Sequence, residues 1–393
     1  MNKFLASFQL NRLFILLYAI LAITAASQAY FQTAKTAPGE SPSVTKYNNY
    51  VIFKYSHCHL IEGKDLYKAY YPDEYWDLYK YSPTFALFFG CFAWFPDWLG
   101  LSLWNLLNAL IFFLAVRYLP GIDDKKKMWI LLFAASDILN SLQNSQSNAL
   151  VAGLIILGFG LFEQKNYFLA TLCLVATFYI KIFGIVALIM LLFYPGKWKS
   201  MAYSVFWLVL LWVIPAVITG FGPLLKAYVQ YIDMLKNDQS VSLGISVMGV
   251  IKSWFGLNTP KTILAITGLI IMCLPILNIK KFAIQSNRLL FLCAMLIWMV
   301  IFNHKAESPT FIIATTGVYI WFFSEKKSAA GIALLVLAVI FTTLSSTDLF
   351  PASWRDGFFL PYNIKAVPCI LIWGAIVIEM FKPNRENSIQ PAN

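Results

Sequence analysis

Apolar runs of helix length follow one another along almost the whole chain, and they limit the possible folds more than any motif does. A backbone that crosses a bilayer must satisfy its hydrogen bonds within its own segment, so such runs predict helices. Charged residues make up only 12% of the sequence, against roughly 25% in a soluble domain. The runs cover residues 13–31, 99–119, 128–140, 148–162, 167–180, 183–194, 201–220, 261–279, 289–302, 309–323, 329–344 and 360–381.

These runs predict an all-α polytopic membrane protein with about twelve transmembrane helices, within a range of about 10–13, because several are shorter than the roughly 20 residues that span a bilayer. We expect a single integral membrane domain, residues 1–393. Its long polar segments would be a first external loop with amphipathic helices, 32–98, and a second large external loop, 221–260. Residues 382–393 would form a cytoplasmic tail.

The basic residues between the apolar runs predict the orientation of the chain. Short connectors such as 125–127, 197–199 and 280–288 hold lysine and arginine, as the positive-inside rule requires of cytoplasmic loops. Both termini would then be cytoplasmic and the long segments external, provided that 82–96 lies on the outer face or dips into it. The net charge of +11 is therefore a sign of topology, not of nucleic-acid binding.

Two further features of the chain concern processing and redox state. Lys3 and Arg12 precede an apolar run and then "ASQA", which is similar to a cleavable signal peptide, but the run continues to Phe31 and favours an uncleaved first span. Five of the six cysteines lie in or beside apolar runs and only Cys58 lies in a long polar loop, so we expect no disulfide framework.

The first external loop contains the most polar stretch of the chain, KYNNYVIFKYSHCHLIEGKDLYKAYYPDEYWDLYKYSPTFAL, residues 46–87. Its acids gain nothing from a lipid interface and indicate a polar site. His57, His59 and Glu62 have the spacing of a short metal motif, but this pattern is common, and we predict no metal. The aromatic side chains are typical of an interfacial belt: Tyr67, Tyr70, Tyr71, Tyr75, Trp76, Tyr79 and Tyr81.

Two more polar islands interrupt the apolar runs on the same predicted side. "SDILNSLQNSQSN", 136–148, predicts either a network between packed helices or contact with a ligand. "FNHKAESPTF", 302–311, predicts a functional site or an ion pair between Lys305 and Glu307. Lys181, deep within an apolar region, would extend to the outer surface or bind an anion. Three polar clusters over a lipid-accessible bundle favour a site for a lipid-linked, hydrophilic substrate.

Several stretches, in order along residues 47–323, resemble those of a known family. They are "NNYVIFKYSHCHLIEGKDLY", "KYSPTFALFFGCFAWFPDWLGLSLWNLLN", "NSQSNALVAGLIILG", "ATFYIKIFGIVALIMLLF" and "NDQSVSLGI". Each motif is weak, and the order is the specific part. The chain resembles the glycosyltransferase C (GT-C) superfamily, in particular its polyprenyl-phosphate-dependent hexosyl- and mannosyltransferases, formerly described as a domain of unknown function.

This resemblance implies a hexosyltransferase with its active site in the first external loop. One hexose would pass, with inversion, from a polyprenyl phosphate donor to a lipid or glycan acceptor at the external, periplasmic face of a bacterial inner membrane. A carboxylate would act as general base, and basic side chains would stabilise the departing phosphate. No cofactor and no nucleic acid are expected.

One departure concerns the family's usual aspartate, which aligns here with Asn49, and asparagine cannot take a proton. The base would then be another residue, and Asp77 and Glu307 are favoured. Asp65 matches a family position that looks structural, and His59 is a further substitute. The expected substrate-binding residues are Asn49, His59, Lys80, Tyr81, Gln146, Asn148, Lys181, His304, Lys305 and Arg355. Two alternatives remain open: a transporter or flippase of lipid-linked sugars, and a catalytically inactive GT-C relative.

Overall fold

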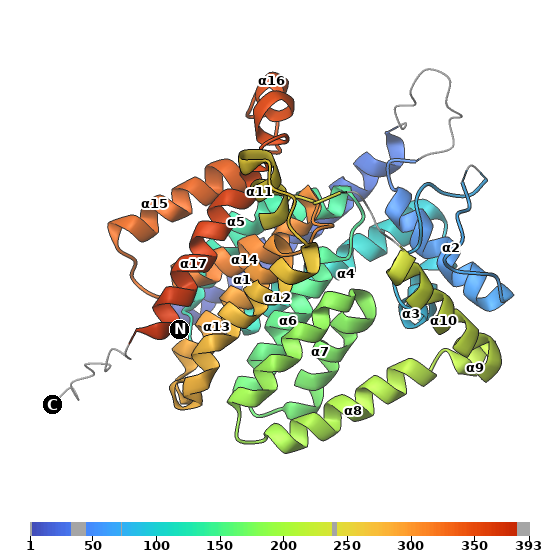
Figure 1. Ribbon diagram of the computed structural model, residues 1–393, viewed down its shortest axis with the longest axis horizontal. Coiled ribbons are helices and arrows are strands. Elements are labelled where there is room, and N and C mark those ends of the chain that lie inside the picture. Colours follow the sequence, from blue (N-terminus) through green and yellow to red (C-terminus); the bar gives the residue numbers. More distant parts are fainter. Residues whose placement is uncertain (1, 33–44, 72, 238–241, 383–393) are drawn as a thin grey trace.

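The computed structural model describes residues 2–32, 45–71, 73–237 and 242–382 (Figure 1). Helices and the turns between them account for these residues, and no strand occurs among them. Residues 238–241 of the motif "NDQSVSLGI" and the tail 383–393 lie outside the described residues. The all-helical class predicted by the apolar runs is thus confirmed for the described part of the chain.

Eight long helices pack together as a bundle, and two of them form its buried centre. Every residue from Leu289 to Ile301 and from Phe311 to Trp321 is buried. Helices that are apolar on all sides belong in such a position. The bundle consists of α1 (Asn2–Phe31), α4 (Asp97–Tyr118), α5 (Asp124–Gln143), α6 (Asn148–Glu163), α7 (Tyr167–Ile180), α13 (Gln285–Ile301), α14 (Phe311–Ser324) and α17 (Val367–Phe381).

The remaining helices lie around this bundle or join its members. The helix α8 runs along one edge in Figure 1 and buries only Ser200, Ser204 and Leu211. The other elements are α2 (Asn48–Glu62), α3 (Pro83–Ala93), α8 (Lys197–Val213), α9 (Ala216–Thr219), α10 (Phe221–Asn237), α11 (Val247–Phe255), α12 (Lys261–Cys273), α15 (Ala329–Leu337) and α16 (Ala352–Trp354). Tighter or wider turns form η1 (Ile182–Phe193), η2 (Leu274–Ala283), η3 (Ser308–Thr310), η4 (Ala338–Thr343), η5 (Arg355–Phe359) and η6 (Ile364–Ala366).

Length and composition suit several of these helices to a membrane. Among the described residues, five stretches are long and apolar enough to cross one: Asn11–Phe31, Asp97–Tyr118, Lys197–Thr219, Lys261–Ala283 and Ile364–Phe381. Six shorter apolar helices accompany them. The count of twelve spans stays a prediction.

The described part of the first external loop is folded. Helix α2 packs on α3, and the Tyr50 hydroxyl donates to the Phe92 carbonyl oxygen at 3.2 Å. A Cβ atom at Gly90 would stand 2.4 Å from the His57 ring, so this close approach requires glycine. With 11 residues, α3 is too short to span a bilayer, and it lies beside α2 and α4. The placement of 82–96 at the outer face stays a prediction.

The expected aromatic belt is wrong for most of its members. Tyr67, Tyr75 and Tyr79 are buried and contact other rings or backbone groups inside the loop, whereas Tyr71 and Trp76 alone among the seven are exposed. Burial removes a large apolar area of each ring from water. The Tyr67 hydroxyl donates to the Tyr81 carbonyl oxygen at 3.0 Å, and the Tyr79 hydroxyl donates to the Ser82 carbonyl oxygen at 2.7 Å. These tyrosines hold the loop together.

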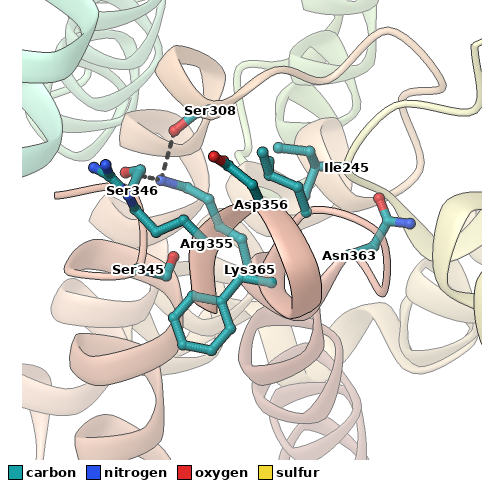
Figure 2. Close-up of a pocket in the computed structure, with 10 residues that line it drawn as sticks. Ile245, Ser308, Ser345, Ser346, Arg355, Asp356, Asn363 and Lys365 are labelled. Atoms are coloured by element: carbon teal, nitrogen blue, oxygen red, sulfur yellow. Dashed lines mark hydrogen bonds between the residues drawn. The ribbon is translucent and has the colours of Figure 1, made fainter. Parts of the chain in front are cut away.

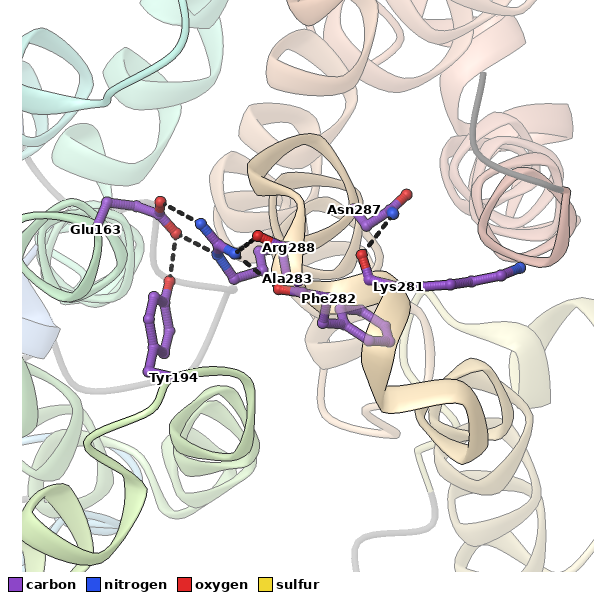
Figure 3. A network of polar contacts seen from close by, with 7 residues as sticks. All are labelled: Glu163, Tyr194, Lys281, Phe282, Ala283, Asn287 and Arg288. Atoms are coloured by element: carbon purple, nitrogen blue, oxygen red, sulfur yellow. Dashed lines mark hydrogen bonds and ion pairs between the residues drawn. The ribbon is translucent and has the colours of Figure 1, made fainter. Parts of the chain in front are cut away.

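The bundle has two ends that differ in chemistry. At the turn end, Glu163 of α6 binds Arg288 of α13 and Tyr194, which follows η1 (Figure 3). At the loop end, defined by residues 140–148, 181, 303–310 and 344–365, hydrogen bonds join polar side chains from helices far apart in the sequence. The loop end holds most of the predicted site residues.

Candidate active site

Lys181 brings three segments of the loop end together. Helix α7 ends at Ile180, and Lys181 follows in extended backbone before η1 begins. Its ammonium donates to Asn148 Oδ1 at 2.6 Å, and Asn148 Nδ2 donates to the Pro309 carbonyl oxygen at 3.0 Å. Asn148 is fully buried. A buried amide that uses both ends in this way fixes the lysine relative to the segment 303–310.

Tyr81 connects the first external loop to the same place. Its hydroxyl donates to Gln146 Oε1 at 3.4 Å and accepts from Ser147 Oγ at 3.4 Å. The Lys181 ammonium lies 5.9 Å from the centre of the Tyr81 ring, within reach of a cation–π interaction. Tyr81, Gln146, Asn148 and Lys181, all predicted from the sequence, are therefore neighbours.

Among the candidate carboxylates, Glu307 is the one whose charge acts on Lys181. Its side chain is exposed, and with Thr310 it forms a capping box at the start of η3, which leads into α14. Lys181 lies in the connection between α7 and η1, outside both helices. Burial lowers the pKa of Lys181 to about 8, and the negative charge of Glu307 opposes that shift. The half-buried Lys181 is thus linked through Asn148 to the segment that carries the exposed Glu307.

Asn49, in α2, contacts the loop end. Its Nδ2 donates to the Asn144 carbonyl oxygen at 2.9 Å, and the Asn144 side chain donates to the Asn140 carbonyl oxygen at 2.8 Å. Asn140 Nδ2 in turn donates to Ser308 Oγ at 3.0 Å. The position at which the family's aspartate is expected is therefore linked through two asparagines to the residue that follows Glu307.

The other two predicted carboxylates have structural partners. Asp65 Oδ1 accepts from the Tyr67 backbone N–H at 2.9 Å, and Oδ2 accepts from Gln230 Nε2 at 2.8 Å. Asp77 is half-exposed in a positive-φ turn, and Lys80 Nζ lies 2.9 Å from both of its oxygens. Lys80 therefore forms an ion pair with Asp77.

His59 belongs to a separate cluster inside the first external loop. The side chain is buried, its Nε2 lies 2.8 Å from Glu74 Oε2, and its ring stacks on Tyr70. Burial lowers the pKa of His59 more than Glu74 raises it. Glu62 pairs with Lys64, and His57 Nδ1 contacts the Ala86 carbonyl oxygen at 3.1 Å. The suggested His57, His59 and Glu62 triad thus does not converge, and no cluster suited to a metal occurs among the described residues.

His304 and Lys305 lie in a turn of the loop end, and Arg355 lies in η5. The Lys305 backbone N–H donates to Asn303 Oδ1 at 2.9 Å, and the backbone of His304 packs against Gly244. Arg355 begins η5 and donates to Asp348 Oδ1 at 2.7 Å. Arg355 also lines a cavity together with Lys365, a residue that the sequence analysis did not single out.

Lys365 and Ser308 were not singled out from the sequence, although Ser308 lies within the predicted island 302–311. Lys365 Nζ donates to Ser308 Oγ at 2.9 Å. The signal for Lys365 is a lysine inside the predicted span 360–381, where a charge is costly unless it has partners. A single serine gives no comparable signal, because its hydroxyl is tolerated almost everywhere.

Comparison with families of known proteins gives one match. The family model of glycosyltransferase family 87 matches residues 79–347, which is more than half of the chain. The matched region includes Tyr81, the island 136–148, Lys181 and Glu307, and it excludes Asn49 and Lys365. No curated protein matches the chain.

Proposed function

Because the chain belongs to glycosyltransferase family 87, we propose that it transfers a hexose from a polyprenyl-phosphate donor to a lipid or glycan acceptor. The reaction would take place at the loop end, on the external face of a bacterial inner membrane, with both termini cytoplasmic. The basic connectors support this orientation, and the apolar surface of the bundle suits a donor with a prenyl chain.

The observation that supports a catalytic role for the loop end is the link from Lys181 through Asn148 to Pro309, two residues after the exposed Glu307. Of the three candidate carboxylates, Asp65 has hydrogen-bond donors on both oxygens and Asp77 is paired with Lys80. Glu307 is exposed at the loop end, where a substrate would have access to it. We assign it the role of general base.

The proposed reaction is a single displacement. The acceptor hydroxyl gives its proton to the Glu307 carboxylate while its oxygen attacks the anomeric carbon of the donor. The bond between that carbon and the phosphate oxygen breaks, and the electron pair leaves with the polyprenyl phosphate. Cationic side chains at the loop end stabilise the charge that develops on this phosphate. The attack from the opposite face inverts the anomeric centre.

The Glu307→Gln variant tests this proposal. Glutamine retains the capping position but cannot take a proton, so transfer from a radiolabelled polyprenyl-phosphate hexose to a membrane lipid extract falls by about 10²- to 10⁴-fold. The matched control is Asp65→Asn, because it makes the same acid-to-amide change at a carboxylate with structural partners. Transfer that survives Glu307→Gln and is lost in Asp77→Asn would give the role of base to Asp77 instead.

A catalytically inactive relative is the second candidate, and Asn49 favours it. The amide at this position donates to a carbonyl group, which a carboxylate cannot do, so residue 49 acts as a connector. An inactive relative would retain the donor lipid and transfer no sugar from any hexose donor, and Glu307→Gln would leave that retention unchanged.

A further inference from the structure

Two charged side chains are almost fully buried near the loop end. Asp137 of α5 is 2% exposed, and Lys365 of η6 is 5% exposed. Their opposite charges act on each other. A buried charge is costly unless another charge compensates it, so each of these side chains depends on the presence of the other.

The short helix η4 holds both of these residues. Thr343 Oγ1 donates to Asp137 Oδ2 at 2.9 Å, and the hydroxyl of Tyr319 on α14 donates to the same oxygen at 3.4 Å. The neighbouring Thr342 donates to the Lys365 carbonyl oxygen at 2.8 Å. Asp137 and Lys365 are thus attached to successive residues of one element. That element has the wide winding of a π-helix, which often occurs at functional sites.

The ammonium of Lys365 extends to the segment that carries Glu307. As Figure 2 shows, it donates to Ser308 Oγ at 2.9 Å and to Ser346 Oγ at 3.1 Å. It also lies 5.3 Å from the centre of the Phe311 ring, at the start of α14. A hydrogen bond from a charged donor is stronger than one between neutral groups, so Lys365 attaches Ser308 firmly.

Ser308 Oγ has a second donor, which comes from α5. Asn140 Nδ2 donates to it at 3.0 Å. The following residue is held from α6, where Asn148 Nδ2 donates to the Pro309 carbonyl oxygen at 3.0 Å. Glu307 itself is exposed, so burial does not fix its carboxylate. Its position depends instead on the bonds that hold the residues after it.

We propose that Asp137 and Lys365 form a positioning pair, which holds Ser308 and thereby places the Glu307 carboxylate for the transfer. Asp137 stabilises the ammonium of Lys365, and Lys365 fixes Ser308 through its hydrogen bond. The inference rests on the proposed function, because it takes Glu307 as the base. The pair acts through Ser308, and the proton of the acceptor still goes to Glu307.

Ser308→Ala tests the attachment without removing a buried charge. Transfer from a radiolabelled polyprenyl-phosphate hexose is measured with the full chain in nanodiscs. We expect kcat to fall about 10- to 100-fold, as a displacement of about 1 Å can cause, while KM changes less than about twofold. The matched control is Ser345→Ala, because this serine lines the cavity of Figure 2 but donates to the Thr342 carbonyl oxygen of its own segment. Its kcat stays at the wild-type value.

Variants of the pair test whether the two charges act together. Lys365→Met and Asp137→Asn each leave one charge buried without the other, so each is expected to lower kcat as Ser308→Ala does. In the double variant neither charge remains, and we expect a loss of kcat smaller than the product of the two single losses. Losses that simply multiply would show that Asp137 and Lys365 act independently, and would overturn the pair.

Hydrogen exchange reports on the segment without any transfer of sugar. The Thr310 backbone N–H donates to the Glu307 carbonyl oxygen at 2.9 Å, and the Glu307 N–H donates to Thr310 Oγ1 at 3.3 Å. In the peptide that contains both, Ser308→Ala and Lys365→Met are expected to speed up exchange at least about tenfold, as for a lost hydrogen bond to a charged group. Ser345→Ala leaves the exchange unchanged.

The two measurements separate this inference from the proposed function. Unchanged exchange in Ser308→Ala would overturn the positioning role, and this variant keeps both buried charges, so it decides the question even if the variants of the pair do not fold. Faster exchange with kcat at the wild-type value would leave the attachment in place and remove Glu307 from the role of base. If the wild-type chain transfers no sugar, faster exchange still supports the attachment, and only the proposed function fails.

Discussion

Lys181 and Lys365 differ in what their ammonium groups contact, although both lie among apolar side chains. Lys181 donates to a buried amide and lies in the field of Glu307, whereas Lys365 donates to two serine hydroxyls and lines a cavity. The first arrangement fixes the position of the lysine. The second places Lys365 between two serine hydroxyls, and the buried Asp137 acts on its charge. Two lysines in one polar region therefore serve different purposes.

The lowered pKa of Lys181 predicts a pH dependence. Its ammonium loses the proton as the pH rises through about 8, so transfer that needs this charge declines above that pH. Arginine stays protonated throughout, and Lys181→Arg is expected to shift the alkaline decline of kcat/KM to higher pH. An alkaline decline at the same pH in both proteins, each scaled to its own maximum, would contradict this role.

The same shift has a consequence for stability. The pKa of Lys181 is about 8 in the folded protein and near its ordinary value of 10.5 in the unfolded chain. Between these values the unfolded chain binds more protons, so the contribution of Lys181 to the free energy of unfolding rises with pH. A fall in transfer above pH 8 is therefore not explained by unfolding through this residue.

Sequence reasoning found the site residues whose polarity contrasts with an apolar run. Gln146, Asn148 and Lys181 interrupt such runs, and a polar group in that position needs a partner, which is why they could be identified. Lys365 was missed because it stands near the start of α17, where a lysine normally extends to the membrane surface. Its actual position depends on Ser308 and Ser346, which come from other segments.

At the scale of elements, the turn end joins α6, η1 and α13 through one ion pair. Arg288 Nε and Nη2 donate to the two carboxylate oxygens of Glu163 at 2.6 and 2.7 Å, and the Tyr194 hydroxyl donates to the same carboxylate at 2.6 Å (Figure 3). Both charged side chains are largely buried, at 13% and 7% exposed. Two parallel hydrogen bonds also fix the orientation of the helices.

Removal of one partner of this pair is expected to be costly. Glu163→Gln leaves the Arg288 guanidinium buried without its counter-charge, and the free energy of unfolding falls by about 3–5 kcal/mol. The double variant Glu163→Gln with Arg288→Met is expected to recover part of this loss. Chemical unfolding in detergent measures both values, and a double variant less stable than the single one would contradict this reasoning.

The limits of the helices were predicted well where polar residues bound them. The run 148–162 became Asn148–Glu163, and 99–119 became Asp97–Tyr118. The run 360–381 was too long, because Asn363 takes a left-handed conformation and the helix begins only after it. Hydropathy alone predicts neither that turn nor the 3-10 helix of η1.

In the whole molecule, the polar loop end and the turn end with its ion pair lie at different ends of the bundle. The predicted orientation places the loop end outside the cell. In a chain whose six cysteines are replaced, Leu349→Cys is expected to react with an impermeant maleimide in intact cells. Lys199→Cys is expected to react only after permeabilisation. Both positions are exposed, so accessibility to the reagent depends on the side of the membrane. Labelling of Lys199→Cys alone in intact cells would reverse the topology.

The ion pair at the turn end ties α6 to α13 at one end of the bundle. Helix α6 is about 24 Å long over its 16 residues. With Glu163 as the pivot, a tilt of about 5° moves Asn148 by about 2 Å, so the rotation displaces the far end of α6 most. Lys181 and the segment 303–310 would move with it. In the proposed transfer from a lipid carrier, such a rotation would open the loop end while the ion pair holds the turn end.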